Sequence, residues 1–276
     1  MDSAEGISGR IVDSATGAPI SGGHVIVALE QQDGTGTDVV FTQADADATG
    51  HFSFRMLPTA SPFDLVAVAI DGSGVAYNAT VVLGVPTGSS LGAIPLVPET
   101  AGPTAPAKIG GFVTASSGSR PSFIRATVSA IQTVTLHDGI SLQVDVPQTV
   151  TINGGDARPI TIPSELGTSA DILVRSASGC PASAGKDVNC AAYTMVVPGS
   201  NPSVALFATG KISYGSPAAG PALYSVRANS FMPSGIGASV CIPSFQSVIG
   251  DEAGNPLKVA PAATVRAQTI AFTGCW

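Results

Sequence analysis

Residues 7–20, ISGRIVDSATGAPI, contain the pattern on which the fold prediction depends. The stretch 7–13 is rich in β-branched residues, which favour an extended chain. It is followed by Thr16-Gly17, where glycine can adopt a positive φ, and Pro19 ends the turn. These signals predict a β-strand over residues 7–13, followed by a tight turn into a second strand.

The same kinds of signal recur along the rest of the chain. Residues 51–56 and 141–146 alternate apolar and polar side chains, the period of two that marks a half-buried strand, whereas residues 65–70 are apolar on both faces and predict a central strand. Turn-forming residues separate such runs at intervals of about ten residues, which is typical of sandwiches and barrels. In the first part of the chain we predict seven strands, at residues 7–13, 23–31, 38–45, 51–57, 63–71, 75–85 and 91–97.

A change of composition at residues 98–107, PETAGPTAPA, divides the chain. The segment holds three prolines and predicts a semi-stiff linker. The sequence therefore predicts an all-β protein with two β-sandwich domains in tandem. Residues 1–98 would form a seven-strand sandwich, residues 99–107 the linker, and residues 108–276 a larger, disulfide-braced sandwich of unassigned family.

The first domain resembles a known family. The opening pattern of carboxypeptidase regulatory-like domains, which are prealbumin-like sandwiches similar to collagen-adhesin B-type repeats, is matched in order by Gly9, Ile11, Asp13, Thr16, Gly17, Pro19, Ile20, Gly22 and Val25. Residues 45–54, DADATGHFSF, resemble a later hairpin of the same family. The resemblance covers residues 6–98 and implies a module used as a spacer, stalk or accessory domain. It implies no zinc chemistry, because catalysis in that family belongs to a separate domain.

The composition excludes some classes of binding partner and indicates the cellular location of the protein. The formal net charge is −7, and only 11% of the residues are charged. The scattered lysines argue against nucleic acid, whose binding needs clustered cations, and no apolar run is long enough to span a membrane. Rare lysine and an even number of cysteines predict an exported protein, extracellular, cell-surface or periplasmic, whose export signal is absent from this sequence. A genuine cytosolic start at Met1 is the alternative.

Four cysteines, all in the last hundred residues, predict two disulfides. Of the three possible connectivities we favour Cys180–Cys190, which closes a short loop, and Cys241–Cys275, which closes a longer one. A zinc site is the competing interpretation. It is disfavoured because the spacing is not of the CxxC type and all three histidines precede residue 140.

One stretch is a weak metal candidate. Asp45 and Asp47 begin a D-x-D-x-T-G segment like the start of a calcium loop. A full loop would place a bidentate glutamate at its twelfth position, but that position is Met56. We therefore favour a solvated hairpin turn, with weak calcium binding as the alternative.

No catalytic residues and no cofactor are predicted. The histidines His24, His51 and His137 lie in or beside predicted strands and turns, and no nucleophile motif accompanies them. We therefore predict a non-enzymatic surface or envelope protein with a structural, adhesive or assembly role, whose long strands could offer edges to a protein partner.

The alternative function is glycan binding by the second domain. Sandwich lectins stack sugar rings on exposed aromatic side chains. The aromatic candidates of the chain are Trp276, Tyr77, Tyr193, Tyr214 and Tyr224. Residues 78–80, NAT, form an N-glycosylation sequon, which matters only in a eukaryotic host.

Overall fold

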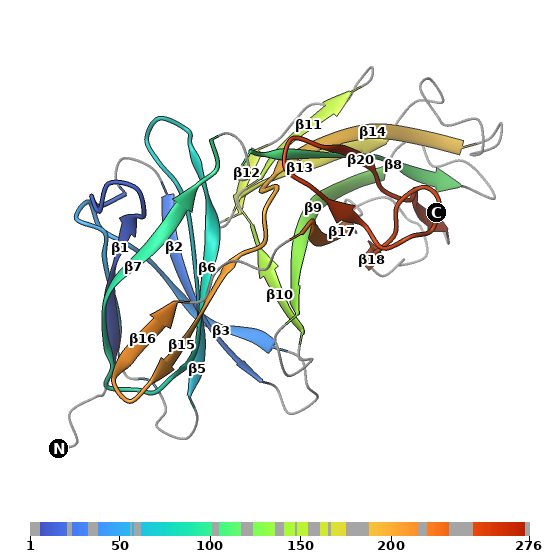
Figure 1. The fold of residues 1–276 in the computed structure, drawn as a ribbon. Coiled ribbons are helices and arrows are strands. Elements are labelled where there is room, and N and C mark those ends of the chain that lie inside the picture. The colour runs from blue at the N-terminus through green and yellow to red at the C-terminus, as the bar shows by residue number, and fades with distance from the viewer. Residues whose placement is uncertain are drawn as a thin grey trace.

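The computed structural model describes residues 6–20, 24–32, 38–55, 57, 62–100, 105–116, 124–135, 141–146, 148–153, 161–164, 167–174, 188–214, 220–231 and 245–273. Every regular element within these ranges is a β-strand, so the predicted all-β class is confirmed. The strands gather into two units that lie side by side (Figure 1). Nowhere in the described ranges is there a helix with the length and apolarity needed to cross a bilayer.

The first unit contains seven strands close to those predicted. They are β1 (Ile7–Asp13), β2 (His24–Gln32), β3 (Asp38–Asp45), β4 (His51–Phe54), β5 (Phe63–Ile70), β6 (Ala76–Val85) and β7 (Ser90–Pro98). Their order is β3-β2-β5-β6-β7-β1-β4, with β1 parallel to β7. The largest difference from the prediction is at β4, which ends three residues early, at Phe54.

Alternation decides which side chains fill the core of this unit. In β4, Phe52 and Phe54 are buried while His51 and Ser53 are exposed, as the period of two predicts. The two rings meet edge to face with centroids 6.0 Å apart, and Ile11 of β1 packs in the same core.

The turn after β1 forms where the sequence predicts it. Gly17 has a φ of 70°, and its N–H donates to the carbonyl of Asp13. The Asp13 carboxylate accepts hydrogen bonds from the N–H groups of Ala15 and Thr16, each at 2.8 Å. The Asp13 side chain thus closes the turn, and Gly17 supplies the positive φ that the turn requires.

The second unit is built from two layers. One layer has the order β12-β13-β9-β17-β18, with β10 and β19 beside it, and the other has the order β11-β14-β8-β20, with β21 paired to β8. The strands are β8 (Ala107–Ser116), β9 (Ile124–Thr135), β10 (Ser141–Asp145), β11 (Thr149–Asn153), β12 (Thr161–Ser164), β13 (Gly167–Val174), β14 (Val188–Val197), β17 (Ala222–Phe231), β18 (Phe245–Val248), β19 (Lys258–Val259), β20 (Thr264–Arg266) and β21 (Ile270–Thr273).

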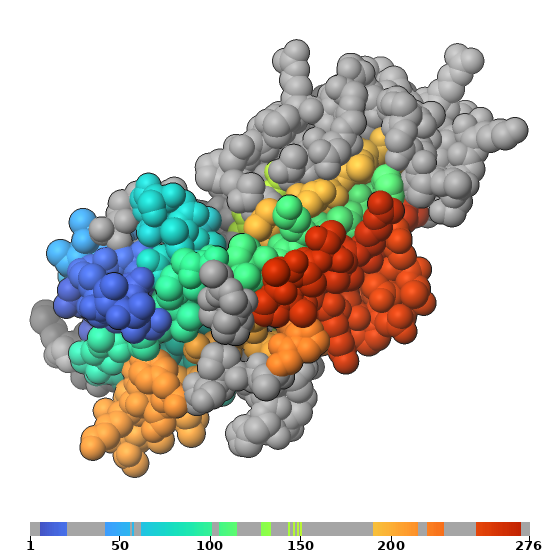
Figure 2. Space-filling view, turned by 45° about the horizontal axis from the view of Figure 1, so that its top comes forward, coloured from blue at the N-terminus to red at the C-terminus, as the bar shows by residue number. Residues whose placement is uncertain are grey.

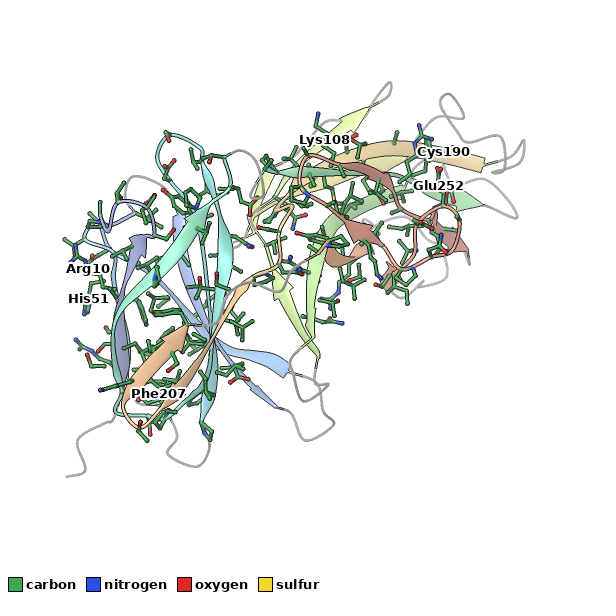
Figure 3. All side chains as sticks on the ribbon, in the orientation of Figure 1. Arg10, His51, Lys108, Cys190, Phe207 and Glu252 are labelled. Atoms are coloured by element: carbon green, nitrogen blue, oxygen red, sulfur yellow. The ribbon has the colours of Figure 1, made fainter. Side chains whose placement is uncertain are left out.

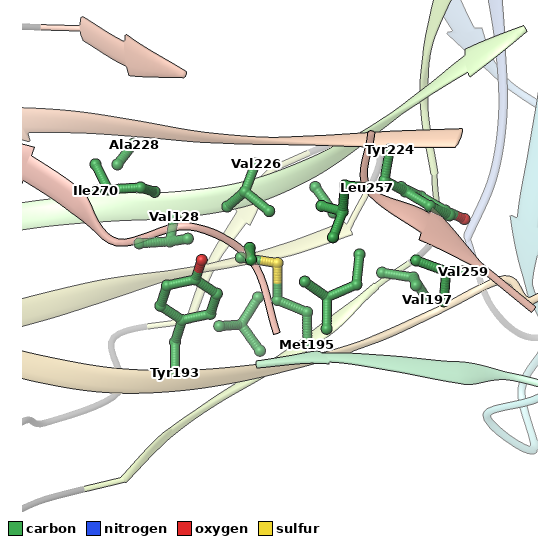
Figure 4. Packing of buried hydrophobic residues seen from close by; sticks show 14 of the residues in the cluster. Val128, Tyr193, Met195, Val197, Tyr224, Val226, Ala228, Leu257, Val259 and Ile270 are labelled. Atoms are coloured by element: carbon green, nitrogen blue, oxygen red, sulfur yellow. The ribbon is translucent and has the colours of Figure 1, made fainter. Parts of the chain in front are cut away.

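Buried apolar side chains from both layers form the core of the second unit. Tyr193, Met195 and Val197 of β14 face Tyr224 and Val226 of β17 across this core (Figure 4). Every second residue of each strand contributes, as expected for a strand with one face buried. The two units therefore have separate apolar cores.

One hairpin that lies late in the sequence nevertheless belongs to the sheet of the first unit. Strands β15 (Ser203–Ala208) and β16 (Lys211–Tyr214) form a hairpin, and β15 pairs in parallel with β6 of the first unit. In Figure 1 this orange hairpin lies against the blue-to-teal strands, and in Figure 2 it forms part of the first unit's surface. Residues 203–214 belong by sequence to the segment 108–276 assigned to the second domain. The domain boundary at residues 99–107 stays a prediction. The chain also passes between the two units before β15 and after β16.

Candidate functional site

The two units meet at a group of buried polar side chains, which we call the junction cluster: Asn78, Glu99, Gln132, Ser200 and Tyr224. Asn78 lies on β6 and Glu99 directly follows β7, whereas Gln132 lies on β9 and Tyr224 on β17. Ser200 lies between β14 and β15, in residues 198–202, which we call the arm. All but Ser200 are buried, and buried polar groups must find hydrogen-bond partners.

Two side chains of the first unit hold the arm. The hydroxyl of Ser200 donates to Glu99 Oε1 at 2.9 Å, and the N–H of Gly199 donates to Glu99 Oε2 at 3.3 Å. The amide of Asn78 donates to Ser200 Oγ at 2.9 Å and to the carbonyl of Asn201 at 2.5 Å. Ser200 is therefore donor to one residue and acceptor from another.

Two side chains of the second unit hold the same arm. Gln132 Nε2 donates to the carbonyl of Ser200 at 2.9 Å, and the hydroxyl of Tyr224 donates to the carbonyl of Pro198 at 2.7 Å. The arm is thus fastened from both sides, although within the described residues Gln132 Oε1 is buried without a hydrogen-bond partner. Buried hydrogen bonds of this kind favour one arrangement of the groups they join.

Burial sets the electrostatics of the junction cluster. It raises the pKa of Glu99 from 4.5 to about 6, although the hydrogen bonds from Ser200 and Gly199 favour the ionised form. Burial also raises the pKa of Tyr224 well above 10, with a further contribution from the charge of Glu99. The donors that face Glu99 are neutral, so the ionised carboxylate is stabilised by hydrogen bonds alone.

The raised pKa predicts that Glu99 contributes more to the stability of the folded protein in mild acid than at neutral pH. Because the folded-state pKa lies above the unfolded value, the stabilisation is complete below 4.5 and is lost as the pH rises through about 6. From about pH 5 to about pH 7.5 we expect Glu99 to lower the free energy of unfolding by about 1 kcal/mol. Glu99→Gln should remove this slope in urea titrations. Glu252→Gln, at an exposed glutamate, should leave it in place, and an unchanged slope in Glu99→Gln would contradict the assignment.

The carboxylate of Asp47, one of the two calcium candidates, is engaged by its own turn. Its Oδ1 accepts from the hydroxyl and N–H of Thr49, at 2.7 and 2.8 Å, and from the N–H of His51 at 3.0 Å. The side-chain hydrogen bond from Thr49 is the largest cause lowering the pKa of Asp47. Among the described residues no three His, Cys, Asp or Glu side chains gather as metal ligands. Calcium binding by Asp45 and Asp47 stays a prediction.

Of the four cysteines, only Cys190, on β14, lies within the described residues. It is disulfide-bonded. Cys180, Cys241 and Cys275 lie outside the described residues, so the pairings Cys180–Cys190 and Cys241–Cys275 stay predictions.

The histidines are not brought together by the described structure. His51 lies at an exposed position opposite Arg10 in the β1–β4 pairing (Figure 3). His24 begins β2, and His137 lies outside the described residues.

The aromatic candidates for sugar binding are mostly inside the protein. Tyr77, Tyr193 and Tyr224 are buried, whereas Tyr214 is 41% exposed and donates to the carbonyl of Ala93. Trp276 lies outside the described residues. The tyrosines buried in the two cores cannot serve as stacking platforms in this fold.

The sequon is also inside the protein. Asn78 is 2% exposed, and its amide nitrogen donates to the arm. The group that would carry a glycan is therefore part of the junction cluster.

Sequence reasoning did not single out the junction cluster. A signal was present at Asn78 and Gln132, each a polar residue within an otherwise apolar or β-branched run. Glu99 stands in a proline-rich segment that predicts a solvated linker, and Ser200 stands in a PGSNP stretch that resembles an ordinary turn.

No family model and no curated protein matches the chain. Among solved structures, the chain is similar to the minor pilin GBS52 of Streptococcus agalactiae, with 9% identity over 99% of this chain and 97% of that one and a TM-score of 0.25. It is similar to the shaft pilin SpaA of Lactobacillus rhamnosus GG, with 9% identity over 96% and 97% and a TM-score of 0.25. A DUF3823 family protein of Bacteroides uniformis has 11% identity over 93% and 99% and a TM-score of 0.25.

A 9R-lipoxygenase from Cyanothece has 15% identity over 34% of this chain, with a TM-score of 0.22, and the match spans only 16% of the lipoxygenase. At TM-scores of this size the likenesses carry no argument about function.

Proposed function

We propose that the chain is a non-enzymatic structural module of the cell surface or envelope, which holds two β-units in a fixed mutual arrangement within an adhesive or larger assembly. The observation that carries the proposal is the fastening of the arm. Asn78 and Glu99 bind it from the first unit, and Gln132 and Tyr224 bind it from the second.

The path of the chain supports a fixed arrangement. The chain passes between the units after β7, after β14 and after β16, because the β15–β16 hairpin belongs to the first sheet while β8, β14 and β17 belong to the second unit. Domains joined by one linker move freely unless their interface is extensive. Several connections and a shared buried polar network restrict such motion.

The proposed location outside the cytoplasm is supported by the disulfide bond of Cys190 and by the composition of the chain. Cys190 is disulfide-bonded, and disulfides persist mainly in oxidising compartments. Few charges and few lysines, on a framework of strands and tight turns, suit an exported protein.

Small-angle scattering tests the fixed arrangement. We expect one arrangement of the two units to account for the wild-type curve. Ser200→Ala removes the hydroxyl that links Asn78 to Glu99, and should increase the maximum dimension while each unit keeps its strand signal. Ser213→Ala, at an exposed serine of β16, should leave the curve unchanged. A wild-type curve that requires a mixture of orientations would contradict the proposal, as would substrate turnover abolished by one substitution.

A further inference from the structure

We propose that the junction cluster is a pH-sensitive fastening, in which protonation of the Glu99 carboxylate strengthens the hold of the first unit on the arm and ionisation weakens it. The carboxylate is buried where the two units meet, and among the described residues it has no ion-pair partner. This inference deepens the proposed function, because it names a condition that regulates the junction, and it rests on that function for its biological use.

The Glu99 carboxylate is covered by the arm itself. Its Oε1 accepts from the hydroxyl of Ser200 at 2.9 Å and its Oε2 accepts from the N–H of Gly199 at 3.3 Å, so both oxygens are bonded to the arm. The N–H of Glu99 donates to the carbonyl of Ala76 on β6 at 2.8 Å, which anchors this residue to the first unit. Release of the arm would therefore return the carboxylate to water while Glu99 stays on the first unit.

The charge of Glu99 is not balanced by a cation in the described part of the chain. The arm, β6 and β7 carry no charged side chain, Lys108 of β8 is exposed, and Arg227 of β17 donates to a side chain of β10. Tyr77 of β6 donates to a carboxylate of its own unit, whereas Tyr224 of β17 interacts with the charge of Glu99. Burial keeps the pKa of Tyr224 well above 10, so Glu99 is the member of the junction cluster that titrates between about pH 5 and about pH 7.5.

Burial decides the sign of the effect. With the arm released, the carboxylate has its ordinary pKa of 4.5, and with the arm in place burial outweighs the two hydrogen bonds and raises the pKa to about 6. The arm is therefore held most firmly below pH 4.5, and this advantage is lost as the pH rises through about 6. From about pH 5 to about pH 7.5, the ratio of released to held arm should rise about five- to tenfold. Each unit keeps its own apolar core, so the release is local.

Amide hydrogen exchange at Gly199 tests this proposal directly. Its N–H donates to Glu99, so it exchanges with solvent when the arm is released. Measured by NMR on the full chain, its protection relative to an unstructured chain at the same pH should fall about five- to tenfold from about pH 5 to about pH 7.5. The N–H of Gly254, bonded at 2.9 Å to the carbonyl of Asp251 in a turn of the second unit, is the matched control and should show no such fall.

Low concentrations of urea distinguish release of the arm from unfolding of the whole chain. Release exposes little surface, so the protection of Gly199 should hardly change with urea, whereas an amide that exchanges only through unfolding loses protection steeply. The N–H of Ile11, which donates to the carbonyl of Gly50 at 2.7 Å, serves as that reference. Equal urea dependence at Gly199 and Ile11 would mean that the arm leaves only when the chain unfolds, and would refute a local fastening.

Three substitutions identify the titrating group. Glu99→Gln removes the titration and should make the protection of Gly199 independent of pH, whereas Glu252→Gln, at an exposed glutamate, should retain the fall seen in the wild type. If Glu99→Gln does not fold, Tyr224→Phe removes the other titratable group of the junction cluster and should also retain the fall. A fall that is absent from the wild type, retained in Glu99→Gln or lost in Tyr224→Phe would overturn the proposal.

The scattering test of the fixed arrangement gives a separate answer. At about pH 5, where the arm is held more firmly than at neutral pH, it measures whether the two units have one mutual orientation. One orientation together with pH-independent protection of Gly199 would leave the proposed function standing and remove only the pH-sensitive fastening. A mixture of orientations at that pH would contradict the fixed arrangement, whatever the exchange of Gly199.

Discussion

Gly50→Ala is expected to destabilise the first unit by about 4 kcal/mol, through two separate effects. Gly50 has a φ of 75°, a conformation that costs residues with a Cβ about 1 kcal/mol or more. A Cβ at this position would also overlap the carbonyl oxygen of Ile11, which is backbone and cannot move aside. The overlap would break the hydrogen bond of 2.7 Å from the N–H of Ile11 to the carbonyl of Gly50.

Gly17→Ala is the matched control for this substitution. Gly17 has a φ of 70°, but a Cβ there would meet nothing within 4 Å. It should therefore show the conformational effect alone, about 1 kcal/mol. Urea titrations measure the free energy of unfolding of both variants, and the dependence on urea concentration should have the same slope as in the wild type. Equal losses in the two would show that the close approach to Ile11 is relieved by movement of the backbone.

These two glycines show why the first unit could be predicted from sequence. Thr16-Gly17 and Gly50 stand at turns, and the strands between turns alternate or are apolar on both faces. Such information is local, because strand period and turn chemistry depend on neighbouring residues. The resemblance to carboxypeptidase regulatory-like domains rests on the same local pattern, and the comparisons confirm no family.

The partner of β15 could not be predicted in this way. The run at residues 203–208 indicates a strand, but nothing in it specifies pairing with β6, whose residues lie more than a hundred positions earlier. Parallel pairing across such a distance depends on how complete units meet. The burial of Glu99 could not be predicted for the same reason. Its carboxylate is covered by the arm, which comes from a distant part of the sequence.

Gly199→Ala is expected to disrupt the junction and to destabilise the folded chain by about 3 kcal/mol. A Cβ on Gly199 would overlap the carbonyl oxygen of Ala105 and the Cα of Pro261, so the arm would have to move away from both. Movement of the arm would lengthen the hydrogen bonds that Glu99 accepts from it, although each unit keeps its own apolar core.

A displaced arm with both apolar cores intact would distinguish Gly199→Ala from a substitution inside one of the cores. Urea titration should show the loss of stability, and small-angle scattering should show a larger maximum dimension under conditions where strand content is unchanged. Gly110→Ala is the control, because a Cβ there makes only an ordinary contact of 3.8 Å with the carbonyl oxygen of Tyr193. If Gly199→Ala were as stable and as compact as Gly110→Ala, the arm would not be the element that fixes the two units.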